Sequence, residues 1–102
     1  SVVTLGMIET AEGLRNLHDI VRVPGLDGVY VGPGDLTLSL FGVDGIDLAS
    51  EEPRYLDALD AVVNACREAG AIAGIFCSSP EVARGAIRRG FTFVTVMSDT
   101  LL

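Results

Sequence analysis

Four short apolar runs constrain the fold of this chain more than any other feature of its sequence. They span residues 2–8, 28–31, 71–76 and 91–97, are rich in Val, Ile or Phe, and carry no charged side chain. Such runs are typical of strands that are buried on both faces of a parallel sheet. The segments between them have a helical period. The order β-α-β-α-β-α-β predicts an α/β fold with parallel strands and right-handed crossovers.

Capping signals mark both ends of the three predicted helices. A Ser or Thr precedes each helix, where its hydroxyl can accept a hydrogen bond from a free backbone N–H group. A Gly or a Pro-Gly pair follows each helix and ends it. The pairs of start and stop residues are Thr10 with Pro24, Ser50 with Gly70, and Ser79 with Gly90. The stretch 41–50 is expected to be a loop.

Charge and composition argue against several classes of partner. The 102 residues include 14 acidic and 7 basic side chains, which give a net charge of -7. Because an acidic chain without a basic stripe repels phosphate groups, no nucleic-acid partner is expected. The apolar runs are too short to span a membrane and the first residues lack the layout of a signal peptide, so no membrane partner is expected. Cys66 and Cys77 form no metal or redox motif, which predicts reduced thiols in a cytoplasmic protein.

Acidic residues follow two neighbouring strands of the predicted sheet. Glu9 comes directly after the first strand, and Asp35 follows the second strand after the sequence Gly-Pro-Gly. In parallel α/β folds the ligand site forms at the carboxyl ends of the strands. Since neighbouring strands lie about 4.8 Å apart, we expect the two carboxylates to converge on one point.

Two converging carboxylates repel each other unless a proton or a cation lies between them. An all-oxygen pair without His or Cys suits Mg²⁺ or Mn²⁺. The Gly-Pro-Gly sequence has no bulky side chain, so the amides of Gly34 and Asp35 can approach an anionic group beside the metal. A purely structural alternative stays open, in which Glu9 is an acid favoured by a helix dipole and Asp35 caps a short helix beginning at Leu36.

The segment MIETAEGLRNLHDIVRVPGLDGVYVGPGDLTLSLFG, residues 7–42, resembles the HpcH/HpaI aldolase/citrate lyase family of the phosphoenolpyruvate and pyruvate superfamily. The similarity rests on IET at a strand end and on G-x-DGV followed by GP-x-DL. It continues in AGAIAGIFCSSPEVARGAIRRGFTFVTVMSDTLL, residues 69–102. The family fold is a TIM (β/α)₈ barrel. The resemblance implies that residues 1–102 are a single partial domain with the fifth to eighth strands, the C-terminal half of an aldolase-type barrel.

The resemblance also implies roles for individual residues. It identifies Glu9 and Asp35 as ligands of a divalent metal, which would be Mg²⁺ or Mn²⁺, with Co²⁺ as a third option. It implies that the amides of Gly34 and Asp35 bind a substrate carboxylate. Phe76 matches an apolar position that reaches toward a neighbouring subunit in some relatives. Met7 stands where many of these aldolases carry a Gln that contacts substrate, which leaves the exact substrate open.

The implied activity is that of a metal-dependent carbon-carbon lyase, a class II aldolase, acting on small 2-keto acids such as pyruvate through a pyruvate enolate. The family's catalytic His and Arg are expected in the barrel half that this chain lacks, so no catalytic residue is assigned here and His18 is expected to be a surface or packing residue. A half barrel leaves two sheet edges free, so association with the missing half or with another copy is expected. The alternatives are a citryl-type acyl-CoA lyase of the same superfamily and a non-catalytic fragment.

Overall fold

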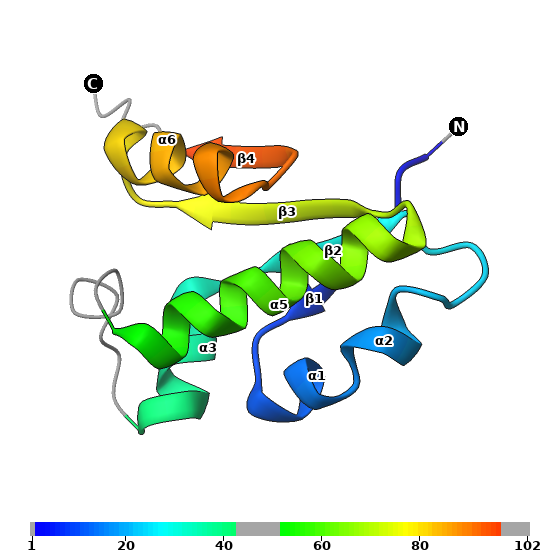
Figure 1. The fold of residues 1–102 in the computed structure, drawn as a ribbon, viewed down its shortest axis with the longest axis horizontal. Coiled ribbons are helices and arrows are strands. Elements are labelled where there is room, and N and C mark those ends of the chain that lie inside the picture. The colour runs from blue at the N-terminus through cyan, green and yellow to red at the C-terminus, as the bar shows by residue number, and fades with distance from the viewer. Residues whose placement is uncertain (1, 43–51, 97–102) are drawn as a thin grey trace.

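The computed structural model describes residues 2–42 and 52–96, in which four parallel strands alternate with helices (Figure 1). The strands lie side by side in chain order, so every crossover joins two neighbours in the sheet. Their bounds are β1 Leu5–Ile8, β2 Gly28–Val31, β3 Ile72–Cys77 and β4 Phe93–Val96. The α/β class and the four predicted strands are therefore confirmed. The loop predicted at 41–50 is wrong at Phe41, which is the last residue of the helix Pro33–Phe41, whereas positions 43–50 and 97 lie outside the described residues.

Five helices accompany these strands in the described part of the chain. They are α1 Ala11–Arg15, α2 Leu17–Ile20, α3 Pro33–Phe41, α5 Pro53–Ala69 and α6 Pro80–Arg89. The single helix predicted after the first strand is thus wrong, because the chain forms two short helices that meet at Asn16. The Asn16 side chain donates a hydrogen bond to the carbonyl of Glu12 at 3.0 Å. Asn side chains of this kind compete with helical hydrogen bonds, which explains the break.

Two of the three predicted N-caps are confirmed. The Thr10 hydroxyl accepts a hydrogen bond from the amide of Gly13 at 3.0 Å, and the Ser79 hydroxyl accepts one from the amide of Val82 at 3.2 Å. The predicted N-cap of α5 is wrong. Glu52 caps this helix, because its carboxylate accepts from the Arg54 amide at 3.3 Å, whereas the predicted cap at position 50 lies outside the described residues.

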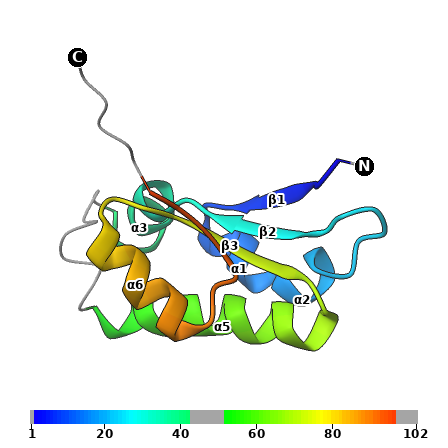
Figure 2. The ribbon, with the colours of Figure 1, turned by 90° about the horizontal axis from the view of Figure 1, so that it is seen from above.

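The hydrophobic core lies between one face of the sheet and helices α1, α2, α5 and α6, which Figure 2 shows below the strands. Alternate residues of the central strands point into it, and Val29, Val31 and Ile75 are almost fully buried. The opposite face is more open, since Met7 is 52% exposed and Phe93 is 45% exposed. In the part of the chain that the structure describes, no helix is both long and apolar enough to cross a membrane.

Candidate functional site

Glu9 lies beside Gly32 where β1 and β2 end. The register pairs Ile8 with Val31, and the amide of Gly32 donates to the carbonyl of Ile8 at 3.2 Å. A Cβ added to Gly32 would lie 3.5 Å from Cγ and 3.8 Å from Oε1 of Glu9. The half-buried Glu9 side chain therefore runs past the position that the Cβ of any other residue at position 32 would occupy. Glycine at position 32 keeps the space beside this carboxylate open.

Asp35 lies in the first turn of α3, directly after the end of β2. The helix begins at Pro33 and has Gly32 as its N-cap, so the alternative in which Asp35 caps a helix starting at Leu36 is wrong. The Asp35 side chain is exposed at the positive end of the helix dipole, which favours a carboxylate. The amides of Gly34 and Asp35 belong to the first turn, where a helix offers no acceptor four residues back. They are suitable donors to an anion.

Buried side chains and hydrogen bonds anchor the first turn of α3. Leu36 and Thr37 are fully buried. The Thr37 hydroxyl donates a hydrogen bond to the carbonyl of Gly34 at 3.0 Å, and the Leu36 amide donates to the carbonyl of Gly32 at 2.9 Å. Because the buried side chains fix the helix, the exposed Asp35 projects from a rigid support.

Met7 and Phe76 lie on the same face of the sheet as Glu9. The Met7 methyl carbon would be 3.6 Å from a Cβ at Gly32, so Met7 and Glu9 flank this glycine together. Phe76 is half-buried on β3, two strands away from β1, and its Cα pairs with Thr95 of β4. The structure thus brings Met7 next to Glu9. The binding roles of Met7 and Phe76 stay predictions.

The available donors fit a hard divalent cation. Glu9 and Asp35 offer carboxylate oxygens, and within residues 2–42 and 52–96 no cluster of three or more His, Cys, Asp or Glu side chains is present. Mg²⁺ is commonly held by one or two carboxylates, with water and substrate oxygens as its other ligands. The open space beside Glu9 leaves room for such additional ligands.

Comparison with known proteins identifies the family. The model of the HpcH/HpaI aldolase/citrate lyase family matches residues 1–102. The chain belongs to the HpcH/HpaI family. A hydroxypyruvate/pyruvate aldolase of Rhizorhabdus wittichii is 42% identical over 99 residues, an alignment that covers 97% of this chain and 39% of the relative. A 4-hydroxy-2-oxo-heptane-1,7-dioate aldolase of Shigella sonnei is 35% identical over 98 residues, covering 96% of this chain and 36% of the relative.

The fold agrees with that of a solved HpcH/HpaI family structure. A HpcH/HpaI aldolase/citrate lyase family protein from Burkholderia cenocepacia J2315 superimposes with a TM-score of 0.86 at 32% identity. The alignment covers 96% of this chain and 37% of that structure. The chain thus spans less than two fifths of the length of each of these three relatives. Its four parallel strands are consecutive strands of the TIM-type barrel of the HpcH/HpaI family.

Sequence reasoning missed a packing cluster on the face that carries Met7 and Glu9. The Tyr30 hydroxyl forms a hydrogen bond with the hydroxyl of Thr95, and the Tyr30 and Phe93 rings lie 6.2 Å apart. Gly74 lies between these two rings, because a Cβ there would be 3.0 Å from Tyr30 and 3.2 Å from Phe93. A glycine inside the apolar run 71–76 was the available signal, since a strand glycine often marks a close approach.

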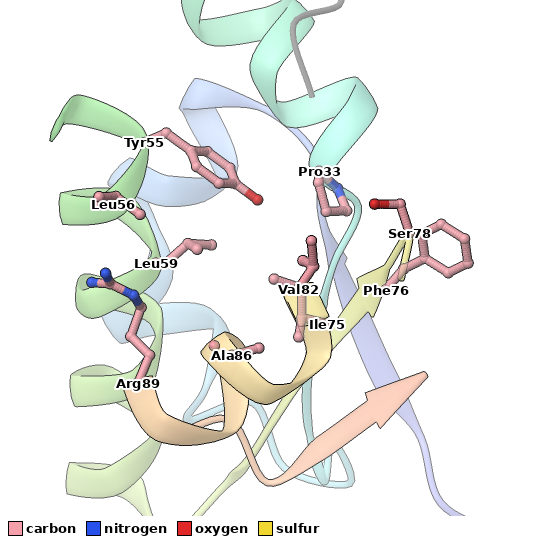
Figure 3. Close-up of a pocket in the computed structure, with 11 residues that line it drawn as sticks. Pro33, Tyr55, Leu56, Leu59, Ile75, Phe76, Ser78, Val82, Ala86 and Arg89 are labelled. Carbon is pink, nitrogen blue, oxygen red and sulfur yellow. The ribbon is translucent and has the colours of Figure 1, made fainter. Parts of the chain in front are cut away.

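A separate pocket of 270 Å³ opens between α5, α6 and the end of β3, and Leu59 and Ile75 are among the apolar residues that line it (Figure 3). Figure 3 shows the Tyr55 hydroxyl pointing into this pocket and the Phe76 ring pointing away from α5 and α6. Tyr55 is 6% exposed. Burial and, to a smaller extent, repulsion from the Cys77 sulfur once it has ionised raise the pKa of Tyr55 to about 12.

The raised Tyr55 pKa predicts a loss of stability in alkaline solution. The unfolded chain releases the phenol proton near pH 10, whereas the folded chain releases it only near pH 12. The contribution of Tyr55 to the free energy of unfolding is therefore fully present below pH 10 and is lost as the pH rises toward 12. We expect the free energy of unfolding to fall by about 1 kcal/mol between pH 9 and pH 11 from this group. Urea titrations followed by circular dichroism at both pH values measure the change. Tyr55→Phe is the control, and an equal loss in this variant would contradict the assignment.

The histidine and the two cysteines are a surface residue and two core residues. His18 is exposed on α2, as predicted. Cys66 and Cys77 are free and buried, and burial raises the pKa of both thiols. The Cys66 thiol also donates to the carbonyl of Ile72 at 3.5 Å. Both cysteines are therefore core residues rather than nucleophiles.

Proposed function

We propose that this chain supplies the metal-binding half of a metal-dependent carbon-carbon lyase, a class II aldolase that acts on 2-keto acids through a pyruvate enolate. The observation that carries the proposal is the position of the Glu9 carboxylate beside Gly32, the N-cap residue of the helix whose first turn contains Asp35. Membership of the HpcH/HpaI family and the names of two relatives, a hydroxypyruvate/pyruvate aldolase and a 4-hydroxy-2-oxo-heptane-1,7-dioate aldolase, support this substrate class.

Each residue of the site has a chemical task in this proposal. Glu9 and Asp35 hold the divalent cation, which is Mg²⁺, Mn²⁺ or, as a third option, Co²⁺. When bound, such a cation supplies Lewis-acid polarisation of the keto oxygen. The amides of Gly34 and Asp35 orient the substrate carboxylate at the positive end of α3. Met7 places an apolar side chain next to the same space.

Acid-base groups come from outside this chain in our proposal. The single histidine, His18, is exposed on α2 and precedes β2, whereas Glu9 follows β1 at the opposite end of the strands. A proton donor and a substrate-binding Arg are therefore assigned to the rest of the barrel or to another copy of the chain. Both cysteines are free and buried, which is consistent with a cytoplasmic location.

Calorimetric titration with Mn²⁺ in the presence and absence of pyruvate tests the proposal. If pyruvate shares the site, bound pyruvate should tighten Mn²⁺ binding by about 5-fold or more, a usual size for coupling between two ligands. Propionate is the matched control, because it has the carboxylate and lacks the keto oxygen. It should tighten binding much less. Tightening by acetyl-CoA instead of pyruvate would favour an acyl-CoA lyase, and the absence of Mn²⁺ binding to a folded chain would refute the metal site.

A further inference from the structure

A side-chain hydrogen bond joins the two segments that carry Glu9 and Asp35. The amide of Ala11 donates to the Ser39 hydroxyl at 2.9 Å. Ala11 is two residues after Glu9, and Ser39 is four residues, or about one helical turn, after Asp35. Residues four apart lie on the same face of a helix, so Ser39 lies below Asp35 on α3. The bond therefore connects the start of α1, which follows Glu9, to helix α3, which carries Asp35.

The amide of Ala11 needs an acceptor from outside its own helix. Ala11 is the first residue of α1, and the first N–H groups of a helix have no acceptor within it. The Thr10 hydroxyl already accepts from Gly13. Among the described residues, Ser39 provides the one side-chain hydrogen bond between α1 and α3. Ser39 therefore caps α1 from helix α3, whereas an ordinary N-cap residue directly precedes its helix in the chain.

We infer that Ser39 is a positioning residue that fixes Glu9 relative to Asp35. This inference rests on the metal site of the proposed function. Helix α3 is already anchored by the buried Leu36 and Thr37, so the position of Asp35 does not depend on Ser39. The start of α1 is anchored less firmly, because α1 contains no fully buried residue and its partly buried Leu14 lies near the end of the helix. The Ser39 bond therefore acts on Glu9, through Thr10, the one residue between Glu9 and Ala11.

Removing the hydroxyl of Ser39 should weaken metal binding while the fold is retained. For Ser39→Ala we expect Mn²⁺ to bind about 3- to 10-fold less tightly, the range that corresponds to one net hydrogen bond. Ser39→Thr keeps the hydroxyl and should restore most of the affinity. Amide hydrogen exchange, measured by NMR, should become faster at Ala11 in Ser39→Ala and stay slow in Ser39→Thr.

Ser79→Ala provides the matched control for a general loss of stability. It removes the same type of bond, a serine hydroxyl that accepts a helix N-terminal amide, at the start of α6. Its Mn²⁺ affinity should equal that of the unaltered chain. An unchanged affinity in Ser39→Ala, or an equal fall in Ser79→Ala, would overturn the role of Ser39. Failure of the proposed function gives a different result, since the unaltered chain itself would then bind no Mn²⁺.

Discussion

Replacing Glu9 by Gln is expected to lower the affinity of the chain for Mn²⁺ by a factor of at least about 100, because loss of groups that only support a metal ligand already costs 10- to 100-fold. The substitution keeps the size of the side chain and its place beside Gly32, and removes only the negative charge. Asp35→Asn should have an effect of similar size. Isothermal titration calorimetry at low ionic strength measures both, with circular dichroism to verify the fold.

The matched control for this prediction is Glu12→Gln. Glu12 lies in the first turn of α1, three residues from Glu9, and its side chain is exposed. The two variants therefore change the net charge by the same amount in the same region. Glu12→Gln should bind Mn²⁺ within about twofold of the unaltered chain, since Glu12 is not a ligand in the proposed site and interactions of exposed charges in water are weak. Equal losses in both variants would show that Mn²⁺ responds to the general negative charge of the surface, and would contradict a specific site.

The sequence was a good guide to the sheet and to the position of Glu9. Apolar runs free of charge predict the strands of a parallel sheet. The predicted burial on both faces is wrong for the described residues, because Met7 and Phe93 are about half exposed on the face that no helix covers. Once the strands are known, their parallel order places all carboxyl ends on one edge, and the residue after β1 must lie there. The position of Glu9 was therefore predictable from pattern and topology alone, and the space that Glu9 occupies beside the Cβ position of Gly32 agrees with that placement.

Helix α3 was harder to predict because its start carries the signals of a turn. Gly32 caps the helix without a side chain, and the sequence Gly-Pro-Gly is more typical of a tight turn than of a first helical turn. Proline is nevertheless favourable at the first helical position, where its missing N–H group is not needed. The bond between Ser39 and Ala11 was not predictable, since it joins residues 28 positions apart and depends on how α1 and α3 pack.

A second large effect is expected for Gly28→Ala, which should lower the free energy of unfolding by at least about 3 kcal/mol, the upper range for overpacking a core. A Cβ at Gly28 would lie 2.1 Å from the carbonyl oxygen of Ile72 and 2.6 Å from its amide nitrogen. These are backbone atoms of the neighbouring strand, so no rotation of a side chain relieves the clash. β2 must move away from β3, and α3 with Asp35 directly follows β2.

Gly85→Ala makes the same chemical change where space is available, and separates the steric effect from the general effect of an added methyl group. Gly85 lies inside α6, and the nearest heavy atom to its added Cβ is a guanidinium nitrogen of Arg88 at 4.0 Å. Alanine favours a helix interior over glycine by up to about 1 kcal/mol, so this variant should be more stable than the unaltered chain. Urea unfolding of both variants should therefore give changes of opposite sign. A Gly28→Ala chain as stable as the unaltered one would mean that β2 and β3 do not approach closely at this position, and the β2–β3 register that pairs Gly28 with Ile72 would have to be revised.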